Sequence, residues 1–369
     1  MVRTRVAIRT LLTFLVAAAG SGCGQADRPL AIGAGLNGPF VDAVRLALAE
    51  TTDPLPPLDT VFVAEATSRA APALEIADRF RLTPGMVAVV AHSNSASSLA
   101  TAPVYNEAGI VQIAPTSTAP RYSDAGPYSF RLVPPDDVQG AVLARAIDSL
   151  FTPAARVAVL YVNDDYGRGI RAALLQHLDA SRSSVVHDQP HADEEFRVAG
   201  AARDAHIASM VSSAAASAPD VIVWLGRAQK LQLHLPAIRR TRSAIPIVGD
   251  DALSSWRTFD RRLGYWDGVR HTDFLDPTAT PELRAFRERF RARYGHEAGT
   301  GDVLSYDGAR LILAALADGA RSGDAVRDWL NALGRERPAF PGLSGSIAFD
   351  ENGDVDRPHV LLTIISPAP

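Results

Sequence analysis

The sequence predicts an α/β protein of two domains, each with a parallel sheet covered by helices on both faces. Short apolar, β-branched runs alternate with segments of helical periodicity along the chain, which is the pattern of βαβ units. The chain has 369 residues and is 47% hydrophobic. Its length exceeds that of a typical single domain. No internal repeat of roughly 20 to 50 residues is present, which argues against a solenoid or propeller.

The N-terminal segment predicts export. Arginines at positions 3, 5 and 9 precede an apolar run at residues 11–19, and small residues follow at Gly20-Ser21-Gly22. This order is typical of a secretory signal peptide, which we place at residues 1–22. The apolar run is too short to cross a membrane, which takes about 20 apolar residues.

Cys23 is the only cysteine of the chain, so an internal disulfide bond is impossible. The segment before it resembles a bacterial lipoprotein signal, with Gly20 where such signals usually carry leucine. We interpret Cys23 as the lipidated residue and residues 23–28 as the linker of a membrane-anchored lipoprotein that faces the periplasm or the cell exterior. Cleavage elsewhere in this segment by an ordinary signal peptidase is the alternative.

The charged residues argue against nucleic-acid and metal binding. Removing residues 1–22 takes away three arginines and no acid, which changes the formal charge from −4 to −7. Nucleic-acid binding needs a basic surface, and we expect none. Asp164 and Asp165 have no histidine or further acid at metal-ligand spacing. We interpret them as charges at a helix N-terminus and expect no metal and no cofactor.

Eight apolar runs predict strands, and a ninth is a further candidate. They cover residues 30–32, 61–64, 87–91, 110–113, 157–162, 185–187, 221–225 and 245–248, with 269–274 as the candidate. These short runs without polar alternation are typical of strands buried in parallel sheets.

Helical periodicity fills the segments between these runs. Residues 41–50 predict a helix, and Phe40 before it can reach a pocket. The apolar residues of 138–150 follow one face behind two acids, and those of 283–294 recur at three and four residues before Gly295, a helix stop signal. Residues 130–135 are extended and rich in proline, which suits a crossing between domains.

Two hydroxyl-rich turns predict a ligand site. The runs at 87–91 and 110–113 enclose a helical segment at 99–108 that is closed by Gly109. The turns that leave parallel strands at their carboxyl ends line one crevice. A small polar ligand suits the side chains that these two turns present, namely Ser93, Asn94, Ser95, Ser97 and Ser98 from one and Thr116, Ser117 and Thr118 from the other.

Several segments resemble, in order and spacing, the leucine/isoleucine/valine-binding type of periplasmic solute-binding protein. They are QIAPTSTAP at 112–120, FRLVPPDDVQ at 130–139, RVAVLYVNDDYGRG at 156–169, DVIVWLG at 220–226, IVGDD at 247–251, YDG at 306–308 and GSIAFDENGD at 345–354. The resemblance covers nearly the whole chain after the signal peptide. It implies the type I periplasmic binding protein fold, in which two Rossmann-like α/β lobes are joined by a three-crossing hinge and enclose a ligand.

The same resemblance divides the chain into lobes. It places residues 29–132 and 252–341 in the N-terminal lobe and residues 133–251 and 342–369 in the C-terminal lobe. The crossings would fall near 130–137, 249–252 and 341–346.

The resemblance also assigns binding residues. Ser95 would meet the carboxylate of the ligand, and Thr116, Ser117 and Thr118 would bind its α-carboxylate and α-ammonium groups, partly through their main chain. Asp251 stands where the family has an acid that pairs with the ammonium. An amino-acid zwitterion that leaves water needs partners for both charges, and this set supplies them.

Two further residues complete the expected site. Tyr166 is placed to cover the ligand from the second lobe. Arg227 lies near the position where an aromatic residue often closes the pocket. This arginine either favours a ligand with a second acidic group or points to solvent.

These features predict a non-enzymatic, exported binding lipoprotein of an ABC importer. It would bind an amino acid or amino-acid-like solute and act as a monomer with permease and ATPase subunits. The alternative in the same fold is a sensing receptor for amides, urea or aromatic acids. No set of catalytic side chains stands out in the sequence.

A dinucleotide-binding fingerprint supports a competing interpretation. Gly33, Gly35 and Gly38 match the G-x-G-x-x-G spacing between a predicted strand and helix, and Glu65 ends the next strand. Alone, this pattern predicts an exported NAD-dependent oxidoreductase. Against it, the acid follows Gly38 by 27 residues rather than about 20, and no side chains for hydride chemistry accompany it.

Overall fold

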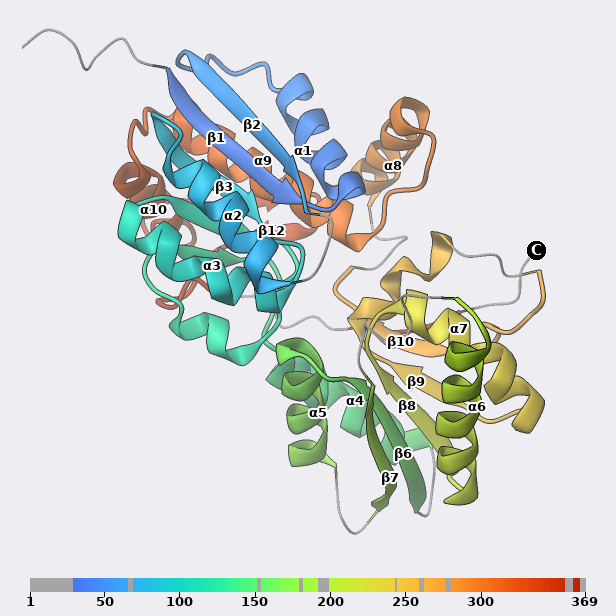
Figure 1. Ribbon diagram of the computed structural model, residues 1–369. Helices are drawn as coiled ribbons and strands as arrows, with labels where there is room; N and C mark the ends of the chain where they lie inside the picture. The colour runs from blue at the N-terminus through green and yellow to red at the C-terminus, as the bar shows by residue number, and fades with distance from the viewer. Residues whose placement is uncertain are drawn as a thin grey trace, which may run out of the picture.

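The molecule consists of two lobes, and each lobe has its own β-sheet with helices packed around it (Figure 1). The computed structural model describes residues 29–65, 69–150, 154–178, 182–191, 199–242, 244–258, 262–275, 280–355 and 361–365. The predicted signal peptide, Cys23 and the linker at 23–28 lie outside the described residues. Among the described helices, none has both the length and the apolarity that a membrane crossing needs.

The first lobe contains a five-stranded sheet in the order β2-β1-β3-β4-β5, with every neighbouring pair parallel. Its helices come from both ends of the chain, and α1 packs against α9. The strands are β1 (Leu30–Leu36), β2 (Leu58–Ala64), β3 (Met86–Ala91), β4 (Val111–Ala114) and β5 (Ser129–Arg131), and the helices are α1 (Gly38–Glu50), α2 (Ala70–Arg81), α3 (Ser95–Ala108), η1 (Pro120–Asp124), α8 (Pro281–Tyr294), α9 (Thr300–Ala317) and α10 (Gly323–Asn331).

The second lobe contains a six-stranded sheet in the order β13-β10-β9-β8-β6-β7. Its strands are parallel except the edge strand β13, which is antiparallel to β10. The strands are β6 (Ala155–Val162), β7 (Ser183–His191), β8 (Val221–Leu225), β9 (Ile247–Gly249), β10 (Arg270–Asp273) and β13 (Leu361–Ile364), and the helices are α4 (Asp136–Leu150), α5 (Asp165–His177), α6 (Ala201–Ala216), α7 (Ala228–Thr241) and η3 (Asp251–Thr258).

All nine predicted strands are present, including the candidate at 269–274. The helix predicted at 99–108 starts earlier than expected, because Asn94 caps it by accepting a hydrogen bond from the Ser97 backbone N–H (2.9 Å). Ser95, Ser97 and Ser98 therefore lie in the helix rather than in the turn. The hairpin of β11 (Phe340–Gly342) and β12 (Gly345–Ile347) and the edge strand β13 are not among the predicted strands, and β5 was expected only as part of the extended crossing at residues 130–135. Three-residue strands carry too little periodicity to detect.

Two predicted lobe boundaries are wrong. The predicted boundary at 252 fails because β10 pairs with β9, which keeps the chain in the second lobe through Asp273. The boundary at 342 fails because Ile347, Phe349 and Val355 are buried in the core of the first lobe. The chain rejoins the second sheet only at β13. Sequence motifs locate these segments along the chain, but strand pairing and core packing determine the lobe to which each segment belongs.

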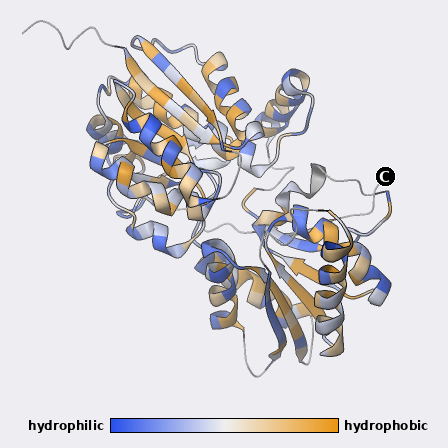
Figure 2. Ribbon diagram, in the orientation of Figure 1, coloured by the Kyte–Doolittle hydropathy of each residue, from blue (hydrophilic) through white to orange (hydrophobic). Residues whose placement is uncertain are grey.

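The apolar residues gather where the sheets meet their helices. In Figure 2 much of the orange lies on the strands of both lobes and on the helix faces toward them, whereas the edge strand β7 is largely blue. Fully buried residues of the first core include Leu36, Ile113 and Leu132, and those of the second include Leu160 and Trp224. Each sheet therefore has its own core, so the lobes can move as separate bodies while the crossings hold them together.

A buried ion pair fastens the first crossing to the third. Arg131, at the end of β5, is fully buried, and its Nε and Nη2 atoms lie 2.6 and 2.7 Å from the two carboxylate oxygens of Asp354. The guanidinium also donates to the Ala119 carbonyl (2.9 Å) and to Ser123 Oγ (2.5 Å). This bidentate pair joins residues 223 positions apart in the sequence, immediately beside the hinge.

Candidate ligand-binding site

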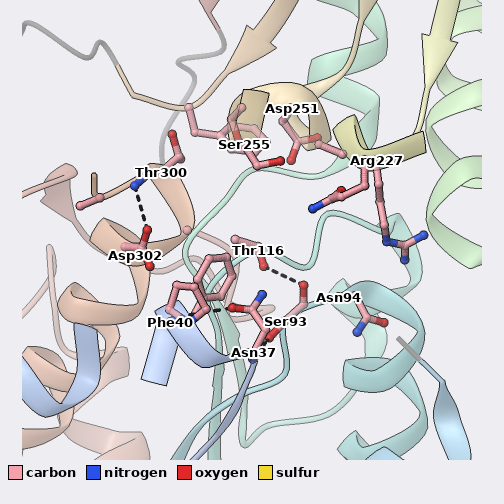
Figure 3. Close-up of a pocket in the computed structure, with 18 of the residues that line it drawn as sticks. Asn37, Phe40, Ser93, Asn94, Thr116, Arg227, Asp251, Ser255, Thr300 and Asp302 are labelled. Carbon is pink, nitrogen blue, oxygen red and sulfur yellow. Dashed lines mark hydrogen bonds between the residues drawn. The ribbon is translucent and has the colours of Figure 1, made fainter. Parts of the chain in front are cut away.

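A cavity of about 710 Å³ lies between the two lobes, with walls from both of them (Figure 3). The described residues that line it are Asn37, Pro39, Phe40, Glu65, Ser93, Asn94, Ser95, Thr116, Tyr166, Arg227, Gln229, Lys230, Asp251, Ala252, Ser254, Ser255, Phe274, His296, Glu297, Ala298, Gly299, Thr300, Gly301 and Asp302. Its volume falls in the range of small-molecule sites, roughly 300–1,000 Å³.

Helix N-termini form the wall that the first lobe contributes. Asn37 caps α1 by accepting a hydrogen bond from the Phe40 N–H (3.4 Å), and Asn94 caps α3. A third N-terminus, that of α9, begins after Gly299. Backbone N–H groups and the helix dipole favour a negative group at such positions. This wall therefore suits a carboxylate.

Ser93 holds the two hydroxyl-rich turns in register. Its Oγ accepts a hydrogen bond from the Asn37 N–H (2.8 Å), its carbonyl accepts one from the Thr116 hydroxyl (3.2 Å), and its N–H donates to Glu65 (2.9 Å). Burial raises the pKa of Glu65, but its hydrogen bonds with His92, Ser97 and Ser93 outweigh burial and leave that pKa lowered. Glu65 is thus a charged group that fixes the first turn.

Asp251 provides the acidic group of the second-lobe wall. The Tyr166 hydroxyl and the Gln139 amide both donate to Asp251 Oδ1 at 2.8 Å. Burial raises the pKa of Asp251 to about 6, although these two hydrogen bonds lower it. The fully buried Asp136 and Asp250 lie behind it, and burial together with Asp251 raises the pKa of each well above its usual value. Near pH 7 the negative charge is therefore carried by Asp251, which faces the cavity.

The structure brings five of the seven predicted binding residues together at this cavity. They are Ser95, Thr116, Tyr166, Arg227 and Asp251, and Phe40 reaches the cavity as expected. Figure 3 shows Asp251 and Arg227 on one side, across from Asn37, Ser93, Asn94 and Thr116.

The remaining two predicted residues, Ser117 and Thr118, are fully buried and do not line the cavity. The Ser117 hydroxyl donates to Ser98 Oγ (2.7 Å), and the Thr118 carbonyl accepts from the Asp136 N–H (2.8 Å). Thr118 therefore supports the junction between the lobes. Contrary to the prediction, neither side chain is placed to bind a ligand in this cavity.

The start of α9 is a part of the cavity wall that the sequence did not predict. A Cβ atom at Gly301 would overlap the Phe40 ring, so only glycine allows this close packing beside the cavity. The Thr300 hydroxyl donates to Asp273 Oδ1 (2.7 Å), which links α9 of the first lobe to β10 of the second. The Gly-Thr-Gly sequence is a local signal for a helix start, but nothing local shows that it faces the turns two hundred residues earlier.

The glycines of the dinucleotide fingerprint have a packing role. Gly33 and Gly35 lie inside β1 rather than after it, and a Cβ atom on either would crowd the Phe80 ring of α2. Only Gly38 stands at the helix start. Close packing of α2 on the sheet therefore explains the spacing without a bound pyrophosphate.

Within the described ranges, no group of three or more histidine, cysteine, aspartate or glutamate side chains is placed to hold a metal ion. The cavity instead presents the N-termini of α1 and α3 on its first-lobe wall and the carboxylate of Asp251 on its second-lobe wall. A zwitterionic organic molecule matches this arrangement.

Comparison with known proteins agrees with this geometry. A model of the periplasmic binding protein family matches residues 33–365. The chain is a periplasmic binding protein. This binding protein is 27% identical over 290 residues to an "Amino acid binding protein" of Pseudomonas aeruginosa, across 77% of this chain and 72% of that one. It is 23% identical over 292 residues to "Leu/Ile/Val-binding protein homolog 1" of Brucella suis, across 78% and 74% of the two chains.

The fold of this binding protein is also that of solved family members. The leucine-binding protein LivK of Thermotoga maritima superposes with a TM-score of 0.78 at 21% identity, covering 91% of this chain and 95% of that one. The type I periplasmic binding protein fold predicted from the sequence is therefore confirmed.

Proposed function

We propose that this protein is the extracytoplasmic substrate-binding component of an ABC importer and that it binds an amino-acid-like solute between its lobes. The observation that carries this proposal is the placement of Asp251 across the cavity from the N-termini of α1 and α3. The acid suits an α-ammonium group, and Ser95, Thr116 and the helix N–H groups suit an α-carboxylate. The names of the bacterial relatives support an amino acid as the ligand.

Closure of the lobes would report binding to the transporter. A ligand that contacts both walls stabilises the closed arrangement and shifts the hinge equilibrium toward it. Permease and ATPase subunits would recognise that closed form. The predicted lipid on Cys23 would keep the protein at the membrane as a monomer.

The test is thermal unfolding of the chain from Gly24 onward, which omits the signal peptide and the predicted lipidated cysteine and is called the processed chain below, with a panel of L-amino acids, amides, small aromatic acids and NAD. A ligand at 100 times its dissociation constant adds about 2.7 kcal/mol to the free energy of unfolding, which raises the melting temperature clearly. We expect an increase with at least one amino acid. An increase with NAD alone would contradict the proposal, and one with aromatic acids or amides alone would favour the receptor alternative.

Affinity for the amino acid should fall at acidic pH. Asp251 has a pKa of about 6 and must be ionised to pair with an ammonium group. Burial is the largest cause of this raised pKa, and Asp273 raises it further, whereas the hydrogen bonds from Gln139 and Tyr166 lower it.

Calorimetric titration should therefore give constant affinity above pH 7 and a loss approaching tenfold for each pH unit below about 6. The Asp251→Asn variant, which cannot ionise, should bind weakly at every pH without this step. An unchanged affinity at pH 5 in the unsubstituted protein would refute the assignment.

A further inference from the structure

Gln139 holds Asp251 by two hydrogen bonds. Its amide nitrogen donates to Asp251 Oδ1 (2.8 Å), and its side-chain carbonyl accepts from the Asp251 backbone N–H (3.3 Å). Gln139 lies in α4, 112 positions before Asp251 in the sequence, and it is fully buried. It is not among the residues that line the cavity. Gln139 therefore fixes both the main chain and the side chain of Asp251 from behind the cavity wall.

The same carboxylate oxygen has a second donor. The hydroxyl of the buried Tyr166, in α5, also donates to Asp251 Oδ1 at 2.8 Å. A carboxylate oxygen has two lone pairs, and these two donors occupy both of them on Oδ1. Oδ2 accepts no hydrogen bond from the part of the chain that the structure describes. Asp251, which Figure 3 shows on the cavity wall between Ser255 and Arg227, therefore has one open oxygen for a ligand.

The surroundings of Asp251 explain why these two donors matter. The titratable groups around Asp251 are mostly acidic, while two cations of α7 line the same cavity; the acidic groups are Asp136, Tyr166, Asp250 and Asp273, and the cations are Arg227 and Lys230. Burial and Asp273 raise the pKa of Asp251, whereas the hydrogen bonds from Gln139 and Tyr166 lower it. Both donors are neutral, so they favour the ionised carboxylate without adding a positive charge that would compete with the ligand.

We infer that Gln139 is a positioning residue that, together with Tyr166, presents Asp251 to the ligand through Oδ2 alone and thereby selects an ammonium group over a guanidinium or amidinium group. This inference rests on the proposed function, because it assumes that Asp251 meets the cationic group of the solute. An ammonium group can donate one N–H to one oxygen, whereas a planar guanidinium pairs best with both oxygens of a carboxylate. Since Oδ1 is already saturated, Asp251 offers no bidentate pairing.

The first test measures the affinity of the processed chain against pH by calorimetric titration, with the L-amino acid of the thermal panel that raises the melting temperature most. Gln139→Met keeps the length of the side chain and removes both hydrogen bonds. Gln176→Met, at an exposed position of α5, is the matched control. We expect the pH below which affinity falls to rise by about one unit in Gln139→Met and to stay at about 6 in Gln176→Met.

A second variant gives the same measurement without changing the buried Gln139. Tyr166→Phe removes the other donor to Oδ1 and should raise the same pH by a similar amount, because each hydrogen bond favours the ionised form of Asp251. If both variants lost affinity equally at every pH while the pH dependence stayed unchanged, the inference would be overturned. Gln139 and Tyr166 would then support the fold of the wall and would have no effect on the charge of Asp251.

The second test compares two derivatives of the same amino acid. The N,N-dimethyl derivative carries its positive charge with a single N–H, and the N-amidino derivative is of similar bulk but carries a guanidinium group. We expect the N-amidino derivative to bind at least about 10-fold more weakly than the dimethyl derivative. Equal or tighter binding of the N-amidino derivative would overturn the inference and leave the proposed function standing. If no amino acid of the panel binds while another solute does, the proposed function and the inference fail together.

Discussion

Replacing Asp251 by alanine is expected to weaken amino-acid binding by about 30-fold or more. The truncation leaves the ligand ammonium without its charged partner in a partly desolvated cavity, and loss of one member of such a pair costs about 2–5 kcal/mol. Tyr166 and Gln139, which both donate to Asp251, would also lose their acceptor. Calorimetric titration of the processed chain with its best amino-acid ligand measures the change.

Two controls make this result specific. Asp251→Asn retains the shape of the side chain and an acceptor for the Tyr166 hydroxyl. Any loss of affinity in this variant therefore measures the contribution of the negative charge to binding. Asp204→Asn removes an exposed acid on α6 that forms a surface salt bridge with Arg203, and it should leave binding unchanged. An alanine variant that binds within about threefold of the original protein, a difference of only about 0.7 kcal/mol, would disprove the role of Asp251.

Replacing Arg131 by methionine is expected to lower the free energy of unfolding by about 3–5 kcal/mol. The substitution removes both hydrogen bonds to Asp354 and those to the Ala119 carbonyl and Ser123. It leaves a largely buried carboxylate without its partner, since the Asp354 side chain is 12% exposed. Urea unfolding followed by circular dichroism measures the loss.

A second variant distinguishes the buried charge from the lost packing. Arg131→Met combined with Asp354→Leu removes both charges, and we expect it to recover much of the stability. Arg81→Met breaks an exposed pair with Asp78 and should change stability by less than about 1 kcal/mol. If Arg131→Met were no more destabilising than Arg81→Met, the ion pair would have no structural importance at the hinge.

Much of the fold is readable from local sequence. The apolar runs at β3 and β8 are buried on both faces of their sheets, so every residue must be apolar, and this pattern is visible without a structure. The ends of helices can also be predicted from local sequence. An example is Gly295, which adopts a left-handed conformation (φ 80°) after α8. The sequence also determined that two hydroxyl-rich turns follow neighbouring parallel strands, and therefore that Ser95 and Thr116 meet at one cavity.

Only the tertiary structure decided what faces those turns. The start of α9 and the first turn of α7 come from segments with no local mark of ligand binding, so Thr300 and Lys230 enter the site through the packing of the lobes. The lobe boundaries depended on the same long-range contacts, because β10 joins the second sheet by hydrogen bonds to β9 and β13. Side-chain periodicity records whether a residue is buried, whereas the identity of its distant neighbour is fixed only when the chain folds.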